Sequence, residues 1–300
     1  MQITAILSDY DGTLSPTDSI RSKENAIPEG LENVLWDISE KIPVCIVSSK
    51  DFNFLHKRTR FAKIVSCILG IETLVLERHK KTGVIPTYSE DKSGRILECQ
   101  DFSCIKNNYI SVDDDDDSLQ NNSEILSQLV EQIGSDFKEV SIEEKFTVTG
   151  KEALAGITID WRHMDDWKSF KVESEPRLRK VITEKQREFP QSNIHIQTYT
   201  THPFVDIYTA KCDKGMAFDR ITSEIPTIEA KRQNIMYLGD SENDNPAFAK
   251  ADVSIGVHSD RRLYPRLDCQ YSIDFDRLPL FLRRLSHDDF EFSDKLFYCY

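Results

Sequence analysis

The stretch AILSDYDGTLSPTD, residues 5–18, places an apolar run directly before two aspartates, Asp9 and Asp11, which are separated by a single residue. A buried carboxylate without a partner is costly, so two at the end of a buried strand need an explanation. One interpretation is a turn, because Asp11-Gly12 is a strong turn dipeptide and Asp9 can cap the next element. The other is a divalent cation and a phosphate group at the strand end. The rest of the sequence decides between them.

Strand and helix patterns alternate in the first quarter of the chain. PEGLENVLWDISEK (28–41) carries apolar residues at helical spacing. IPVCIVSSKD (42–51) is an apolar run that ends in polar residues, which is typical of a buried parallel strand. The alternation returns after residue 211, in KGMAFDRITSEI, QNIMYLGDSENDNPAF and ADVSIGV. The pattern predicts an α/β fold with a doubly wound parallel sheet.

The middle of the chain has a different pattern. It reads strand, strand, helix, strand, strand through FTVTG, AGITIDWR, EPRLRKVITEKQREF, NIHIQTYTT and FVDIYTA, which is typical of an α+β layer. We therefore expect a core formed by residues 1–78 and 207–300, with an inserted α+β domain at 79–206. The run of five aspartates at 113–117 is interpreted as a solvated loop before the helix SLQNNSEILSQLVEQIG.

Composition restricts the partners. The net charge of −13 argues against non-specific binding to nucleic acid or to an anionic membrane. No apolar stretch approaches the roughly 20 residues that a membrane-spanning helix needs. The seven cysteines are scattered without a CxxC pair, and MQITAIL is too short for the core of a signal peptide. We expect a cytoplasmic protein whose partner is a small molecule.

Polar groups follow three of the predicted parallel strands, in LSDYDG, IVSSKD and YLGDSENDN. Ligands bind at such carboxyl ends in open α/β sheets. Carboxylates gathered there would repel one another unless a hard cation neutralised them, and Mg²⁺ prefers oxygen ligands. Hydroxyl groups and a lysine are suited to hold phosphate oxygens. The candidate metal ligands are Asp9, Asp11, Asp240 and Asp244, and the candidate phosphate-binding residues are Ser48, Ser49 and Lys214.

These residue types suggest a reaction. A carboxylate brought close to a phosphate group can attack phosphorus and form an aspartyl-phosphate, and Asp9 is the candidate nucleophile. Asp11 can protonate the leaving oxygen and then accept a proton from water, as a general acid and base. Mg²⁺ and Lys214 would stabilise the charge on the phosphoryl oxygens.

DYDGTL, VSSKD, DKG and GDSENDN resemble, in this order, the four motifs of the haloacid dehalogenase superfamily of aspartate-nucleophile phosphohydrolases. The resemblance covers about residues 1–78 and 205–285 and implies a Rossmann-like core. It implies that Asp9 is the nucleophile and Asp11 the acid/base. It also implies that Mg²⁺ binds to Asp9, the main-chain carbonyl of Asp11 and Asp240, with Asp244 supporting the site.

The inserted segment resembles the C2 type of cap of that superfamily, as in phosphatases of trehalose 6-phosphate, sucrose phosphate and mannosyl-3-phosphoglycerate. This implies a Mg²⁺-dependent phosphomonoesterase acting on a small phosphorylated metabolite, above all a sugar phosphate such as trehalose 6-phosphate. A phosphosugar mutase or phosphotransferase, and a non-catalytic sugar-phosphate sensor, are the alternatives.

Two features of the sequence allow two interpretations each. Arg162 is the candidate in the inserted domain for contact with the non-reacting part of a substrate, and a salt-bridged residue on the outer face of a strand is the alternative. The aromatic segment FSDKLFYCY (292–300) either packs back on the core or meets a partner.

Overall fold

The computed structural model describes residues 1–16, 26–77, 105–110, 116–148, 152–190, 192–200, 202–228, 234–258 and 267–298. The chain divides into two compact units. The core unit consists of Met1–Tyr109 and Lys214–Tyr300, and the inserted unit consists of Ile110–Asp213.

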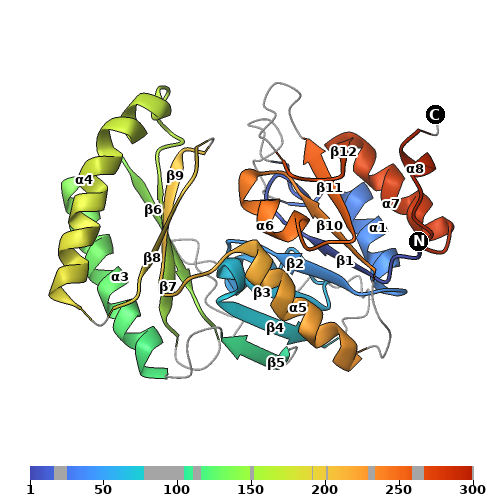
Figure 1. Cartoon of the computed structure of the whole chain (residues 1–300), viewed down its shortest axis with the longest axis horizontal. Coiled ribbons are helices and arrows are strands. Elements are labelled where there is room, and N and C mark those ends of the chain that lie inside the picture. The colour runs from blue at the N-terminus through green and yellow to red at the C-terminus, as the bar shows by residue number, and fades with distance from the viewer. Residues whose placement is uncertain are drawn as a thin grey trace. The chain divides into compact units, whose positions relative to one another are not determined.

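The described part of the core unit is built on an eight-stranded sheet with the order β12-β11-β10-β1-β2-β3-β4-β5 (Figure 1). The strands from β12 to β3 are parallel, and β4 runs antiparallel to β3. The chain order reverses between β1 and β10, which makes this the topological switch point of the doubly wound sheet. The bounds are β1 Ala5–Ser8, β2 Val44–Val47, β3 Ile64–Cys67, β4 Glu72–Leu76, β5 Ile105–Ile110, β10 Ile235–Gly239, β11 Val253–His258 and β12 Tyr271–Asp274.

Helices cover both faces of this sheet (Figure 1). On one face α1 (Glu29–Ser39) and α7 (Leu278–His287) pack together, and on the other lie α5 (Lys214–Ile228) and α6 (Asn245–Phe248). As expected from its spacing, α1 buries Leu31, Val34, Leu35 and Ile38, which form one stripe along the helix. The short helix α2 (Phe52–His56) follows β2.

The described part of the inserted unit contains a four-stranded antiparallel sheet with the order β6-β7-β9-β8. Its bounds are β6 Ser141–Phe146, β7 Leu154–Asp160, β8 His195–Thr198 and β9 Phe204–Tyr208, and its helices are α3 Asp116–Asp136 and α4 Trp167–Glu188. Alternate residues of the central strands, Ile157, Ile159, Val205 and Ile207, join the apolar cores of these helices. The other residues of the strands point to the opposite face of the sheet.

The start of the expected inserted domain, near residue 79, lies outside the described residues, which resume at 105. The strand β5 falls within the range expected for that domain and forms the edge of the core sheet, beyond β4. Of the five consecutive aspartates, those at 113–115 lie outside the described residues, and α3 begins at Asp116.

The C-terminal aromatic residues pack back on the core unit. The ring of Phe297 stacks on those of Tyr271 and Phe281, with centroids 5.2 and 5.0 Å apart, and Phe292 contacts Tyr271 edge-on. The hydroxyl of Tyr271 donates to Asp294 at 2.9 Å. For residues 292–298 the structure therefore favours the first of the two alternatives. None of the described helices combines the length and the apolar character needed to cross a membrane.

Candidate active site

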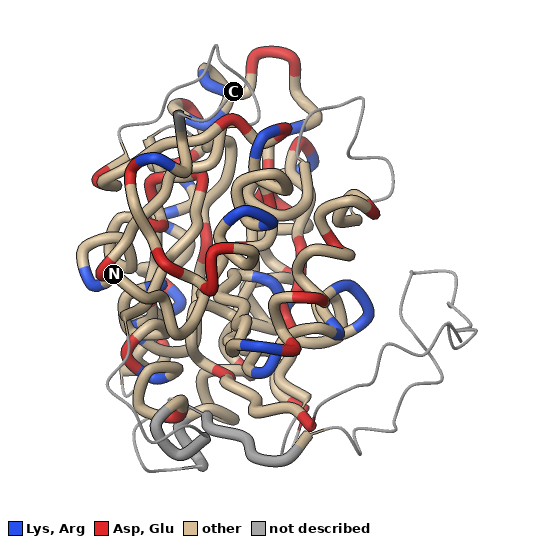
Figure 2. Tube along the Cα trace, turned by 90° about the vertical axis from the view of Figure 1, so that its right-hand side faces the viewer, with Lys and Arg blue, Asp and Glu red and all other residues tan. Residues whose placement is uncertain are grey.

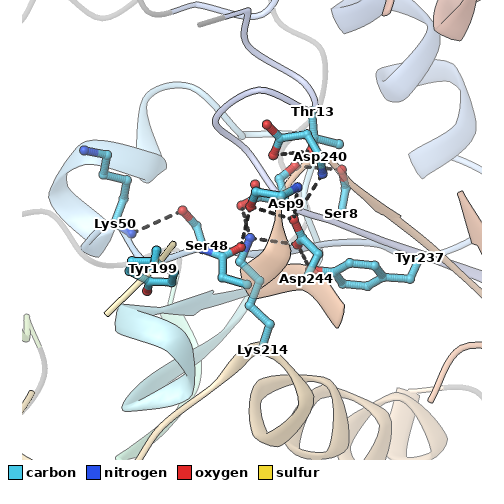
Figure 3. Close-up of polar contacts among 12 residues, drawn as sticks. Ser8, Asp9, Thr13, Ser48, Lys50, Tyr199, Lys214, Tyr237, Asp240 and Asp244 are labelled. Carbon is cyan, nitrogen blue, oxygen red and sulfur yellow. Dashed lines mark hydrogen bonds and ion pairs between the residues drawn. The ribbon is translucent and has the colours of Figure 1, made fainter. Parts of the chain in front are cut away.

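The candidate site forms where the chain order of the core sheet reverses. Asp9 follows β1 and Asp240 follows β10, and these two strands pair directly, with Ser8 opposite Leu238. The amide of Asp9 donates to the carbonyl of Leu238 at 2.9 Å, which continues the ladder to the first carboxylate. Among the described residues, carboxylate oxygens of Asp9, Asp240 and Asp244 lie within 4.8 Å of one another (Figure 3).

One lysine lies among these carboxylates (Figure 3). Lys214, the first residue of α5, has its Nζ atom 2.9 Å from Oδ1 of Asp9 and 2.7 Å from Oδ1 of Asp244. Burial of the ammonium opposes its charge, but Asp244 and Asp9 outweigh this effect and raise the pKa of Lys214. The lysine is therefore a fixed positive charge at neutral pH.

More hydrogen-bond donors surround the Asp244 carboxylate than it has lone-pair sites to accept them. A carboxylate has about four such sites. Its Oδ1 atom accepts from Lys214 and, at 2.7 Å, from the hydroxyl of Tyr237. Its Oδ2 atom accepts from the amides of Asp240 and Ser241 at 3.1 and 3.0 Å, and from the Ser241 hydroxyl at 3.2 Å. Ser241 and Asp244 also form a capping box on the 3-10 turn Glu242–Asp244. Asp244 thus fixes both the loop after β10 and the lysine.

Two glycines allow the carboxylates to approach the backbone. Gly12 has a φ of +82°, and a Cβ atom there would lie 1.9 Å from Oδ2 of Asp240. A Cβ atom on Gly239 would lie 2.4 Å from Cγ of Asp244. Thr13, next to Gly12, donates to Oδ1 of Asp240 at 3.4 Å. The dipeptides Asp11-Gly12 and Gly239-Asp240 are therefore part of the site for steric reasons as well as for their charge.

The cluster carries more negative charge than one lysine neutralises. Burial raises the pKa of Asp9 to about 7, although Lys214 acts against this and Asp244 adds to it. Burial and the Asp9 carboxylate raise the pKa of Asp240 as well. Such a group of buried carboxylate oxygens fits a hard divalent cation such as Mg²⁺, which takes oxygen ligands.

The other residues expected at the site have different surroundings. Asp11 is half-buried in the turn after β1 and lies outside the group of three clustered carboxylates. Ser48, just after β2, is buried, and its Oγ atom accepts from the amide of Lys50 at 3.2 Å (Figure 3). Ser49 is half-buried beside it.

Arg162, in the inserted unit, forms an ion pair with a neighbour on its own chain segment. Its Nε atom donates to Oδ2 of Asp160 at 2.6 Å and its Nη2 atom lies 2.6 Å from the same oxygen, while 61% of the arginine side chain is exposed. This arrangement matches the salt-bridged alternative for Arg162.

A second polar cluster lies in the inserted unit, on the sheet face opposite α3 and α4. Asp206 of β9 accepts from Tyr199 at 2.8 Å, from Lys145 of β6 at 3.4 Å and from Thr158 of β7. All four side chains are buried. None of these four residues belongs to a motif that is recognisable in the sequence. The sequence does contain a signal for Asp206, which is a charged residue between two apolar ones in a strand. Its neighbours Val205 and Ile207 face the helices, so Asp206 points to the other face of the sheet.

The whole chain is acidic, with 51 aspartates and glutamates against 38 lysines and arginines. Figure 2 shows the two kinds of charge interspersed along the trace. The overall field therefore repels an anion, so a site for an anionic ligand must supply its own positive charge, as Lys214 does here.

The fold and the site together define an α/β protein with an acidic centre and a buried lysine at the switch point of its sheet. The family model for haloacid dehalogenase-like hydrolases matches residues 6–262 of the chain. The protein therefore belongs to this family, and the resemblance seen in its four motifs is confirmed. No curated protein matches the chain.

Solved structures share the fold. A trehalose-6-phosphate phosphatase related protein is 18% identical, with a TM-score of 0.56 over 95% of this chain and 97% of that one. The C-terminal domain of the C. albicans trehalose-6-phosphate phosphatase is 15% identical, with a TM-score of 0.60 over 95% and 93%. A haloacid dehalogenase-like hydrolase from Bacteroides thetaiotaomicron is 13% identical, with a TM-score of 0.56 over 95% and 100%. At these identities the likeness concerns the fold alone.

Proposed function

We propose that this protein is a Mg²⁺-dependent phosphomonoesterase that hydrolyses a small phosphorylated metabolite through an aspartyl-phosphate on Asp9. One observation carries the proposal: the Asp9 carboxylate lies at the switch point of the sheet, grouped with Asp240 and Asp244 and paired with Lys214 at 2.9 Å. A carboxylate nucleophile has to be ionised and held in place. The buried ammonium of Lys214 favours the ionised form of Asp9 and fixes its position. Membership of the hydrolase family supports this assignment.

The metal proposal rests on the donor set. Asp9, Asp240 and the main-chain carbonyl of Asp11 would hold Mg²⁺, and Asp244, whose oxygens already accept several donors, would support the loop. When bound, Mg²⁺ would neutralise part of the carboxylate charge and stabilise the charge on the phosphoryl oxygens.

The proposed reaction has two halves. In the first, a carboxylate oxygen of Asp9 bonds to phosphorus while the bond from phosphorus to the leaving oxygen breaks, and Asp11 gives its proton to that oxygen. In the second, the Asp11 carboxylate takes a proton from a water molecule whose oxygen bonds to phosphorus, and the bond from phosphorus to Asp9 breaks. The products are the alcohol and inorganic phosphate, and both aspartates return to their initial states.

Three groups would hold the non-bridging phosphoryl oxygens. These are the Ser48 hydroxyl, the Ser49 amide and the Lys214 ammonium. Donors placed in advance around oxygens that gain negative charge stabilise the transition state more than the ground state, and in comparable sites each is worth about 10²–10³-fold in turnover.

We propose a sugar phosphate, such as trehalose 6-phosphate, as the substrate, with the inserted unit acting as a cap that selects it. One of the proteins that share the fold is named a trehalose-6-phosphate phosphatase, and another is named a protein related to this enzyme. The polar cluster around Asp206 offers buried donors and acceptors of the kind that bind sugar hydroxyls. A buried ion pair such as Lys145–Asp206 adds little net stability, so its presence favours a role in recognition.

Phosphate release from a panel of phosphorylated metabolites, with and without Mg²⁺, tests the function. The panel contains trehalose 6-phosphate, sucrose 6-phosphate, mannosyl-3-phosphoglycerate, hexose phosphates and phosphoglycolate. We expect Mg²⁺-dependent turnover, with one sugar phosphate far ahead of the others. An isomerised sugar phosphate without phosphate release would instead identify a mutase, and ligand binding without any reaction would identify a sensor.

A further inference from the structure

The turn that follows β3 has an unusual backbone. Three consecutive residues adopt the left-handed region, with φ of 50° at Ile68, 54° at Leu69 and 95° at Gly70. This region suits glycine, and a β-branched residue such as isoleucine is among the least suited to it. All three residues are buried. A conformation of this kind persists only where the surrounding structure fixes it, and such positions cluster at functional sites.

The amides of this turn hold the segment that carries Ser48. The N–H of Leu69 donates to the carbonyl of Ser48, and the N–H of Ile68 donates to the carbonyl of Lys50, both at 3.0 Å. In an extended strand, neighbouring amides point to opposite edges, so they would not both reach one adjacent segment. The left-handed turn brings them to the same side. The Ser48 amide in turn donates to Ser66 at 3.0 Å, so Ser48 is held through both of its main-chain polar groups.

The same turn contacts the helix that carries the lysine. A Cβ atom added to Gly70 would lie 3.0 Å from both Cα and Cβ of Ala217, and 3.1 Å from its amide nitrogen. Ala217 is buried in α5, three residues after Lys214. The turn is therefore packed against the backbone of α5 on one side and hydrogen-bonded to the Ser48 segment on the other.

We propose that the turn Ile68–Gly70 is a positioning element that sets the Ser48 hydroxyl relative to the Lys214 ammonium, with Gly70 as its key residue. The proposal rests on the proposed function, in which these two groups hold the same phosphoryl group. Neither Leu69 nor Gly70 would contact the substrate. Each acts through the segment or helix that it holds in place.

Two variants separate positioning from general stability. Gly70→Ala adds one methyl group but opposes the left-handed φ, and its Cβ atom, 3.0 Å from Ala217, requires the turn or α5 to shift slightly. Leu69→Gly removes a large buried side chain but suits the left-handed backbone and keeps the amide that binds Ser48. Gly30→Ala, on α1, is the matched control, because nothing lies within 4 Å of its added Cβ and its φ is ordinary.

Two readouts apply to all three variants. Hydrogen exchange, followed by mass spectrometry, reports the protection of residues 44–51. Phosphate release, at a temperature where each variant is folded, reports kcat and KM. We expect Gly70→Ala to lose about tenfold in protection over residues 44–51, and about tenfold or more in kcat. Leu69→Gly should lose more thermal stability yet keep more of that protection and of kcat, and Gly30→Ala should match the wild type.

The proposal is overturned if folded Gly70→Ala matches Gly30→Ala, or if Leu69→Gly loosens residues 44–51 as much as Gly70→Ala does. Should Gly70→Ala fail to fold, Leu69→Gly decides alone, since retained protection supports the proposal and lost protection contradicts it. A wild-type protein that releases phosphate from no substrate refutes the proposed function. The exchange data then still decide whether the turn holds the Ser48 segment.

Discussion

Lys214 and Asp9 form an ion pair in which Nζ lies 2.9 Å from Oδ1, and only 1% and 7% of the two side chains are exposed. The two residues, at positions 9 and 214, lie 205 positions apart in the sequence. They come together because α5 begins near the carboxyl end of β1. A pair buried this deeply costs desolvation energy that its Coulomb attraction repays only with good geometry and further partners. Asp244 supplies that partner at 2.7 Å from the same nitrogen.

Asp9→Asn should abolish turnover and leave the protein folded. Because burial raises the pKa of Asp9 to about 7, the ionised form is disfavoured in the metal-free protein. A neutral asparagine removes that unfavourable charge, so we expect the metal-free variant to unfold near or above the wild-type temperature at about pH 8. Phosphate release checks the expected loss of turnover, and thermal unfolding checks the expected stability. Turnover at the wild-type rate would rule out Asp9 as the nucleophile.

Lys214→Met should be strongly destabilising, because it leaves Asp9 and Asp244 buried without their shared cation. Removal of one partner from a buried ion pair lowers the free energy of unfolding by about 3–5 kcal/mol. Unfolding in urea measures this loss. The control is Lys250→Met, which breaks the exposed pair with Asp219. An exposed pair is worth about 0–1 kcal/mol. Equal losses in the two variants would contradict the assignment of Lys214 as the buried counter-ion.

Magnesium should stabilise the folded protein more at about pH 8 than at about pH 5, since a metal ion competes with protons for the same carboxylates. The ordinary pKa of Asp9 is 3.8 and the folded value is about 7. Between these values the folded protein holds a proton that the unfolded chain releases, so metal-free stability falls as the pH rises through this window.

The check is the unfolding temperature at both pH values, with EDTA or with Mg²⁺. At about 100 times the dissociation constant, the bound ion adds about 2.7 kcal/mol to the free energy of unfolding. A shift that is the same at both pH values, or absent, would argue against a metal site at these carboxylates.

Tyr237→Phe should weaken Mg²⁺ binding, although Tyr237 is not a proposed ligand. Its hydroxyl donates to Asp244 at 2.7 Å, and Asp244 accepts from the amide of Asp240 and so shapes the loop that carries this ligand. Groups that orient metal ligands are worth about 10–100-fold in metal affinity, and we expect the lower end because Asp244 keeps four other donors. A titration of activity with Mg²⁺ measures this. An unchanged Mg²⁺ requirement would restrict Tyr237 to a structural role.

Lys145→Met and Asp206→Asn test the proposed recognition role of the inserted unit. Each should raise KM for the sugar phosphate about tenfold or more. The reason is that a buried hydrogen-bonding group left without its partner in the complex weakens ligand binding strongly. Turnover of 4-nitrophenyl phosphate, which has no sugar hydroxyls, is the control and should change little. Parallel losses on both substrates would indicate that the pair serves folding alone.

The core fold and most of the site could be predicted because their signals are local. Apolar runs that end in polar residues marked the carboxyl ends of β1, β2 and β10, and strand adjacency then brought Asp9 and Asp240 together. Helical spacing located α1 for the same reason. The dipeptide Asp11-Gly12 is compatible with a turn or with a cation site on sequence grounds, and the structure adds that Gly12 makes room for Asp240.

Other features depend on contacts between distant segments, which no local pattern records. Tyr237 reads as an ordinary strand residue, and its hydrogen bond to Asp244 depends on the shape of the following loop. The left-handed backbone at Ile68 and Leu69 contradicts local propensity, so tertiary contacts must impose it. The strand β5 lies beyond a long connection, so the sequence pattern assigns its residues to the inserted domain although they pair in the core sheet.

The central claim is that Asp9 accepts the phosphoryl group. Its most direct test is rapid acid quenching of the enzyme during turnover with Mg²⁺, followed by mass spectrometry of the peptide that contains Asp9. The account predicts one phosphoryl group on that peptide, on Asp9, and none in Asp9→Asn. A quenched enzyme that turns over substrate without any phosphorylated peptide, or with the phosphoryl group on another residue, would contradict it.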